Sequence, residues 1–177
     1  MKKNNNRGSA FILVIVALAL ITIFTSTIFM QINHQIKNNY DLLINVNTKY
    51  AAEAGIENTI SKLIEQIESK VNTYLQSSDK LSSVFSESDI YLELPSYTYS
   101  FGENYGYTVE SIEKIPIEIL YSNTKVQSIE DILLEIISIG TNRGKIYKIK
   151  SEVIFKTKKL SNGSFQTSYD IKTYDKM

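Results

Sequence analysis

The chain opens with a long apolar run, and its hydrophobic period then changes twice along the sequence. No ionisable side chain occurs from Ala10 to Met30. A helix over residues 10–30 spans about 30 Å, which matches the hydrocarbon thickness of a bilayer. The apolar core of a cleaved secretory signal is shorter, at roughly 7 to 15 residues. The sequence therefore predicts a membrane-spanning segment over residues 10–30 that stays with the protein.

Beyond Met30 the apolar residues recur at spacings of three and four, which indicates a helix with one apolar face. No proline occurs before Pro95, and Gly55 is the only glycine between Gly8 and Gly102. We expect one helix over residues 9–76, with its striped second half packed on the rest of the fold. The alternative is a break around residues 31–39, where polar residues lower helix propensity. The stripe consists of Ile32, Ile36, Tyr40, Leu43, Val46, Tyr50 and Ala54, followed by Ile56, Ile60, Leu63, Ile67, Val71 and Tyr74.

From Ile90 onward the period falls to two, which is typical of β-strands. The strands predict an antiparallel sheet of about four strands with the striped half of the helix across one face, which is an α+β fold. The alternating aromatic residues from Tyr97 to Tyr107 are compatible with a sugar-binding surface, but their period favours a core face. Residues 77–96 and 114–130 are expected to be loops or irregular strands. Turns are predicted at Gly102-Glu103-Asn104, Asn142-Arg143-Gly144 and Asn162-Gly163, the last leading into residues 165–173.

The charges around the apolar run predict how the chain is oriented. Lys2, Lys3 and Arg7 precede it, and the next charge is Lys37. The excess of positive charge places the N-terminus in the cytoplasm and everything after Met30 outside. Since no acid lies before Gly8, residues 9–177 carry 16 basic and 19 acidic groups. This balance gives no basic surface for nucleic acid, and we expect no nucleic-acid partner. The expected partner of the apolar helix is the membrane.

The inventory of reactive side chains argues against an enzyme. The chain has no cysteine and a single histidine, His34. Thiol nucleophiles and thiolate metal sites are therefore excluded, and the position of the one histidine just past the apolar run argues against triads and His-rich metal sites. We predict no catalytic residue, no cofactor, no metal site and no small-molecule substrate. The acidic residues Glu87, Asp89 and Glu93 leave calcium open, but a solvated loop is favoured because no glycine-centred calcium loop accompanies them.

Two motifs together resemble a known family. Arg7-Gly8-Ser9 stands immediately before Ala10-Phe11-Ile12-Leu13-Val14, and Tyr50-Ala51-Ala52-Glu53-Ala54-Gly55-Ile56-Glu57 follows some forty residues later. Over roughly residues 1–65 the chain resembles PilX-type minor pilins of the type IV filament superfamily, which are related to K-type pseudopilins. A K-type subunit normally has a large helical insertion that this chain has no room for, so PilX is the closer resemblance.

The resemblance implies a class III leader over residues 1–8, which a prepilin peptidase cuts after Gly8 on the cytoplasmic side. Ser9 would then become the mature N-terminus and be N-methylated. The implied partners are the peptidase, other pilins and minor pilins. Removal of Lys2, Lys3 and Arg7 would release the helix for transfer into a bundle of neighbouring subunits.

The resemblance also points to residues for subunit assembly. Major pilins carry a glutamate at the fifth mature position, which is Leu13 in this chain. The missing acid favours a minor subunit at the start or tip of a filament over a shaft subunit. Phe11, Leu13, Glu53 and Gly55 are the expected assembly residues, although Glu53 and Glu57 equally fit a plain polar side of the helix.

The predicted organisation is thus a leader (1–8), a long helix (9–76) and a β-rich head (77–177). The expected function is that of a minor pilin-like subunit, anchored in the cytoplasmic membrane and then exposed at the cell surface in a filament. Two alternatives stay open. One is a permanently anchored extracellular binding module, and the other is a type II secretion or competence pseudopilin.

Overall fold

The computed structural model describes residues 7–78, 90–122 and 125–177. By contacts the chain divides into two compact units, Met1–Leu43 and Ile44–Met177. The single helix of the described residues, α1, runs from Arg7 to Ser78 and is unbroken through residues 31–39. The alternative of a break at that point is therefore wrong. We call Ile44–Met177 the C-terminal unit.

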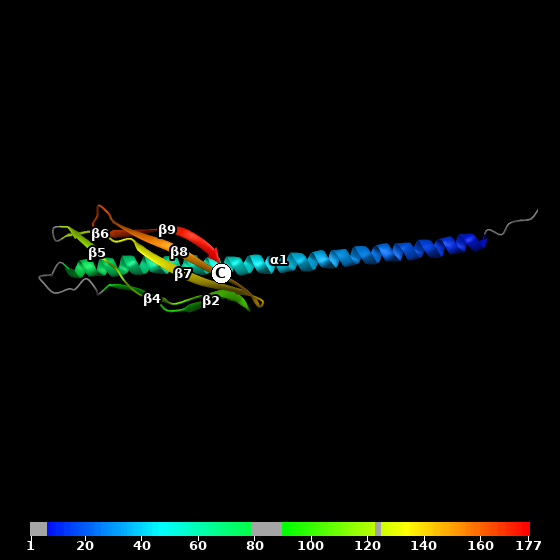
Figure 1. Cartoon of the computed structure of the whole chain (residues 1–177), viewed down its shortest axis with the longest axis horizontal. Helices are drawn as coiled ribbons and strands as arrows, with labels where there is room; N and C mark the ends of the chain where they lie inside the picture. The colour runs from blue at the N-terminus through cyan, green and yellow to red at the C-terminus, as the bar shows by residue number, and fades with distance from the viewer. Residues whose placement is uncertain (1–6, 79–89, 123–124) are drawn as a thin grey trace, which may run out of the picture. The chain divides into compact units, whose positions relative to one another are not determined.

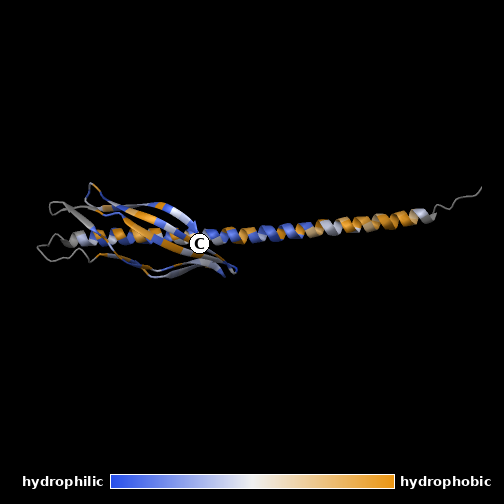
Figure 2. Cartoon of the chain, viewed as in Figure 1, coloured by the Kyte–Doolittle hydropathy of each residue, from blue (hydrophilic) through white to orange (hydrophobic). Residues whose placement is uncertain are grey.

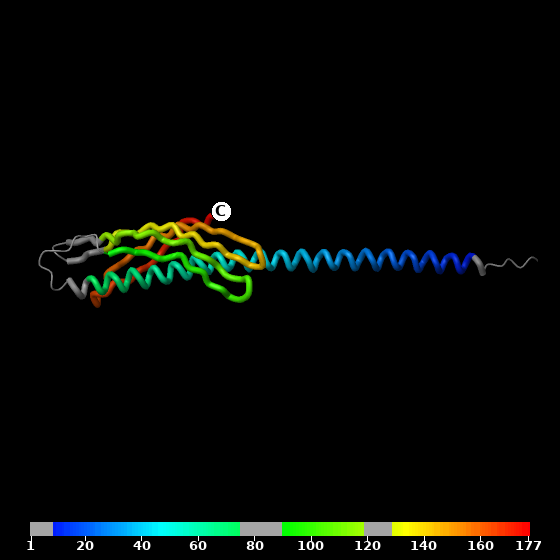
Figure 3. The backbone as a smooth tube through the Cα atoms, turned by 90° about the horizontal axis from the view of Figure 1, so that it is seen from below, coloured from blue at the N-terminus to red at the C-terminus, as the bar shows by residue number. Residues whose placement is uncertain are grey.

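The C-terminal unit is built on a five-stranded antiparallel sheet in the order β2-β3-β7-β8-β9. One face of this sheet packs on the second part of α1 (Figures 1 and 3). The α+β class is thereby confirmed, with one strand more than the four expected. The strands of this sheet are β2 (Tyr97–Gly102), β3 (Tyr105–Val109), β7 (Ile132–Asn142), β8 (Lys145–Lys159) and β9 (Phe165–Lys176).

The expected turns connect these strands. Asn104 and Arg143 have φ angles of 57° and 48°, and Gly144 and Gly163 have φ angles of 80° and 89°. Asparagine and glycine adopt this left-handed region at low cost, which is why these positions form tight hairpins. The segments expected as loops or irregular strands contain two short ribbons. One ribbon pairs β1 (Tyr91–Leu94) with β4 (Ile112–Pro116), and the other pairs β5 (Ile119–Ser122) with β6 (Lys125–Ile129).

The core lies between α1 and the sheet. The second series of the predicted stripe is buried from Ile56 to Val71 and meets alternate residues of β7 and β8, among them Leu134, Ile136 and Phe155. Of the first series, Ala54 packs against this core, but the expectation that Val46 and Tyr50 lie on the same face is wrong. Val46 and Tyr50 are exposed, and the helix instead turns small residues to the sheet there. Those residues are Thr48, Ala51, Ala52 and Gly55.

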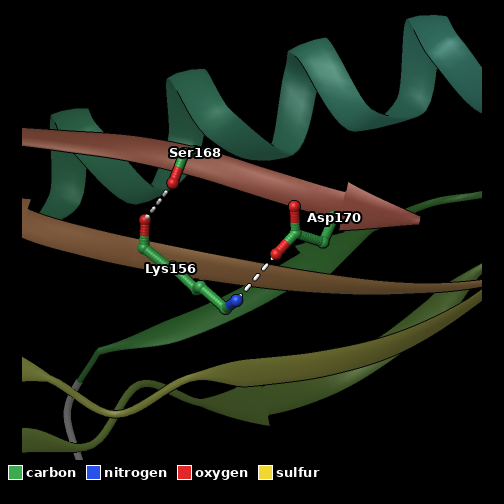
Figure 4. Close-up of polar contacts among 3 residues, drawn as sticks. All are labelled: Lys156, Ser168 and Asp170. Atoms are coloured by element: carbon green, nitrogen blue, oxygen red, sulfur yellow. Dashed lines mark hydrogen bonds and ion pairs between the residues drawn. The ribbon is translucent and has the colours of Figure 1, made fainter. Parts of the chain in front are cut away.

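The far face of the sheet carries both exposed apolar residues, such as Leu133 and Ile146, and ion pairs between neighbouring strands. Figure 4 shows one of them, in which Lys156 Nζ lies 2.7 Å from Asp170 Oδ2 and Ser168 Oγ donates to the Lys156 carbonyl. The hydrogen bond from Lys156 lowers the pKa of Asp170 below its usual value. Exposed pairs of this kind add little stability, and the alternation of apolar residues sets which face of β8 and β9 meets solvent.

Strand β9 forms one edge of the sheet, and α1 caps part of that edge. The Thr167 amide donates to Glu68 Oε1 at 2.8 Å, and the Phe165 amide donates to Asn72 Oδ1 at 3.4 Å. Open edges expose unpaired amides and invite pairing with other chains. The helix side chains therefore satisfy two donors that a partner strand would otherwise take.

Replacing Glu68 with alanine is expected to lower the free energy of unfolding by about 1 kcal/mol, because the partly buried Thr167 amide loses its acceptor. Amide exchange measured by mass spectrometry should speed up at the start of β9. Glu65→Ala, an exposed position on the same helix, is the matched control and should change neither quantity. Equal exchange rates in both variants would contradict the capping role.

Candidate membrane segment and assembly surface

The N-terminal part of α1 exposes apolar side chains on all sides. Every residue from Ser9 to Met30 is exposed, and Figure 2 shows the mainly apolar colour of this stretch. Among the described residues, α1 is the one helix long and apolar enough to cross a membrane. A surface of this kind is incompatible with water on every side, so this segment requires a lipid or protein environment.

The polar side chains inside the apolar segment are satisfied by the helix itself. The hydroxyls of Thr22, Thr25, Ser26 and Thr27 each donate to the carbonyl four residues earlier, over 2.7–2.9 Å. A hydroxyl without a partner is costly in hydrocarbon. With these bonds made internally, none of the four hydroxyls is an unmet donor to the surroundings.

The structure places the predicted processing and assembly residues of this segment on its surface. Gly8 lies within the first turns of α1, and Ser9 is exposed. Phe11 and Leu13 are 67% and 70% exposed. Both apolar side chains are therefore available for contact with another molecule, as an assembly role requires. Their predicted role in assembly stays a prediction.

Gly55 lies elsewhere, in the buried contact between α1 and β7. A Cβ atom at Gly55 would collide with Ser138 Oγ and crowd the Tyr107 ring. On the strand, a Cβ atom at Gly140 would collide with backbone atoms of Thr48 and Ala52. The Ala-Ala-Glu-Ala-Gly motif thus lets the helix approach the sheet closely, and Gly55 has a packing role within the chain. Its predicted role in subunit contact stays a prediction.

We call this contact the small-residue seam. Its helix half could be recognised from sequence as a motif, but its strand half, Ser138 and Gly140, was not predicted. A glycine inside an otherwise apolar strand is a signal for close backbone approach, and Gly140 carried that signal. The seam also explains why the large residues Val46 and Tyr50 turn away from the sheet, since no space remains for them there.

Glu53 lies at the rim of the helix–sheet contact. Its carboxylate pairs with Lys49 over 3.4 Å, one turn earlier on α1. Glu53 and Glu57 line a shallow pocket of about 360 Å³ together with Tyr174 from β9. Burial raises the pKa of Tyr174, and the negative charges of Glu53 and Glu57 raise it further. Glu53 therefore interacts within its own chain as well as facing solvent.

The candidate calcium ligands are not brought together by the described residues. Glu87 and Asp89 lie outside them, and Glu93 is an exposed residue of β1. Within residues 7–78, 90–122 and 125–177, no group of three or more acidic or histidine side chains could hold a metal ion.

The aromatic residues of β2 were expected to be part of the core, but two of them are about half exposed although they lie on the helix side of the sheet. Tyr99 and Phe101 are 51% and 48% exposed, whereas Tyr107 on β3 is buried. Strand β2 is the edge of the sheet opposite β9, and the helix covers Tyr107 but leaves the outer rings open. Alternation correctly placed these rings on the helix side, but it carries no information about how far the helix covers that side.

Comparisons with family models, with curated proteins and with solved structures found no match to this chain.

Proposed function

We propose that the chain is a minor pilin-like structural subunit that takes part in the assembly of a type IV pilus or a related filament, either at its initiation or at its tip. The observation that carries this proposal is the surface of residues 9–30, which is apolar on every side and has its hydroxyls bonded internally. Such a helix is equally satisfied by lipid and by the apolar sides of neighbouring helices. It is therefore suited to pass from one to the other.

The leader gives the proposed transfer a trigger. Lys2, Lys3 and Arg7 are the charges that precede the apolar segment. While they are present, the positive-inside preference holds the helix end at the cytoplasmic face. Cleavage after Gly8 removes all three, and the remaining helix end meets a smaller barrier to outward movement. In this proposal the C-terminal unit lies outside the cytoplasmic membrane and later at the cell surface.

Two further features support a minor position in the filament. Leu13 stands where major pilins carry an acid, so this subunit has no side chain there to pair with the N-terminal amine of an earlier subunit. The helix also keeps exposed apolar residues beyond the predicted span: Ile32, Ile36, Tyr40 and Leu43 are all exposed in the N-terminal unit. These side chains offer apolar area for contact with other helices of a bundle.

The test is the substitution Gly8→Ala, which is expected to block cleavage. N-terminal sequencing of the wild-type protein, purified from cells with an intact prepilin peptidase, should begin at Ser9 with a methylated amine. The variant should begin at Met1 and stay in the membrane fraction, absent from sheared filaments. Gly102→Ala makes the same chemical change at an open position of the hairpin between β2 and β3, and it should leave cleavage normal.

A wild-type protein that begins at Met1 in such cells would overturn the proposed mechanism and favour a permanently anchored module. Normal incorporation of Gly8→Ala into filaments would also contradict it. A secretion or competence pseudopilin uses the same cleavage, so the class of filament with which the wild-type protein co-purifies separates that alternative from a pilus.

A further inference from the structure

A groove runs between one flank of α1 and the edge strand β2 within the C-terminal unit. Its volume is about 370 Å³, within the range of about 300–1,000 Å³ that is typical of small-molecule sites. One wall is the helix and the other is aromatic. We call it the aromatic groove; it is lined by Ala54, Glu57, Asn58, Ser61, Tyr99, Phe101 and Tyr107.

The aromatic wall is a supported layer of rings. Tyr99 stacks on Tyr107 with centroids 5.7 Å apart and planes 19° apart, and Phe101 lies 5.7 Å from Tyr107. Tyr107 is anchored because its hydroxyl accepts a hydrogen bond from Asn58 Nδ2 on the helix. Tyr105 packs on Phe101 at 5.0 Å. The half-exposed rings of Tyr99 and Phe101 therefore have a fixed position, although their outer surfaces face solvent.

The helix wall is polar. Glu57, Asn58 and Ser61 place a carboxylate, an amide and a hydroxyl along the same flank of α1. In the described residues, Glu57 and Ser61 form no hydrogen bond or ion pair with another side chain. The groove thus combines an apolar ring surface with hydrogen-bonding groups that a ligand can use. Asn58 lies within one helical turn of both Glu57 and Ser61.

We propose that the aromatic groove binds a neutral saccharide, with one sugar ring packed on Tyr99, the Phe101 ring standing beside it at 68° to Tyr99, and the sugar hydroxyls bonded to Glu57, Asn58 and Ser61. A pyranose has this two-sided character, because its C–H face is apolar and its rim carries hydroxyls. Aromatic rings provide a rigid apolar area for the C–H face, and a carboxylate accepts strong hydrogen bonds from the hydroxyls.

The geometry favours a saccharide over two other occupants. A quaternary ammonium group has no hydrogen-bonding atom, so it would leave the amide of Asn58 and the hydroxyl of Ser61 without a partner in the groove. A second protein copy needs a larger apolar patch than two half-exposed rings beside three polar side chains. The groove lies wholly within the C-terminal unit, so a saccharide would bind there whether or not the leader is removed.

The test uses the full chain in phosphatidylglycerol nanodiscs, which contain neither sugar-bearing detergent nor choline. The probes are an array of neutral mono- to tetrasaccharides built from glucose, galactose, mannose and N-acetylglucosamine. The best binder is then titrated by calorimetry. Tyr99→Ala and Phe101→Ala should each weaken binding at least about tenfold, since each removes one ring of the stacking surface. Tyr99→Phe keeps the ring and should bind like the wild type.

Tyr169→Ala is the matched control, because Tyr169 is a similarly exposed ring on the opposite edge strand, β9. It should leave saccharide binding unchanged. Near-ultraviolet circular dichroism verifies that each variant is folded. The proposal is overturned if no saccharide of the array binds, or if Tyr99→Ala and Phe101→Ala bind as tightly as the wild type. The proposal is also overturned if Tyr99→Ala weakens only the binding of tetramethylammonium, or only the self-association of the chain, and leaves saccharide binding unchanged.

Discussion

Gly140→Ala should destabilise the C-terminal unit by about 3 kcal/mol or more, the largest effect we expect from adding a single methyl group to this chain. Glycine in a strand normally weakens it, so alanine at an open site would be neutral or favourable. At Gly140, however, the new Cβ atom would collide with the carbonyl oxygen of Thr48 and the amide nitrogen of Ala52. Both are backbone atoms of α1, so only a shift of the helix relieves the collision.

Thermal unfolding of the full chain, monitored by near-ultraviolet circular dichroism of its 12 tyrosines, measures this loss. Gly102→Ala is the control, because a Cβ atom there meets nothing within 4 Å. Gly55→Ala is the informative comparison, since its obstacle is the Ser138 hydroxyl and not a backbone atom. Adding Ser138→Ala should recover part of the stability lost in Gly55→Ala. A wild-type unfolding temperature for Gly140→Ala would show that the seam is loosely packed.

Phe155→Ala is expected to cost about 3–5 kcal/mol, because it leaves a cavity at the centre of the helix–sheet core. Phe155 is fully buried on β8, where it pairs with Ile132 on one side and Tyr169 on the other. Relaxation around the missing ring is limited, since strands on both sides hold the backbone in register. The unfolding midpoint in urea should therefore fall markedly.

Leu133→Ala provides the control on the neighbouring strand. Leu133 lies on the exposed face of β7, one residue from Ile132, and should lose no more than about 0.5 kcal/mol. An equal loss in both variants would contradict the assignment of the core to the helix side of the sheet. An unchanged slope of free energy against urea would verify that the native state stays equally compact.

The strands and turns of this chain could be predicted because local chemistry determines them. Asn142-Arg143-Gly144 and Asn162-Gly163 supply residues that tolerate positive φ, and the structure has positive φ at Arg143, Gly144 and Gly163. The alternation of Ile149, Val153 and Phe155 correctly gave the buried face of β8. These features depend on a few neighbouring residues, so a single sequence contains the needed information.

The extent of helix coverage could not be predicted in the same way. Whether Val46, Tyr50, Tyr99 and Phe101 are buried depends on where α1 meets the sheet, and that is set by contacts between residues far apart in sequence. Gly140 lies 88 residues from Ala52, and a pattern search along the chain does not connect them. Long apolar residues on a periodic stripe were therefore assigned to the core, although the close approach at the seam leaves room only for small ones.

The capping of β9 by α1 has a consequence for the order of events during biosynthesis. Glu68 and Asn72 accept hydrogen bonds from backbone amides that are translated 99 and 93 residues later. Until β7 and β8 have been translated, the apolar stripe from Ile56 to Val71 lacks the strands that cover it. In the proposed orientation, with the C-terminal unit outside, the chain would cross the membrane before β9 pairs, and the sheet would close on the far side.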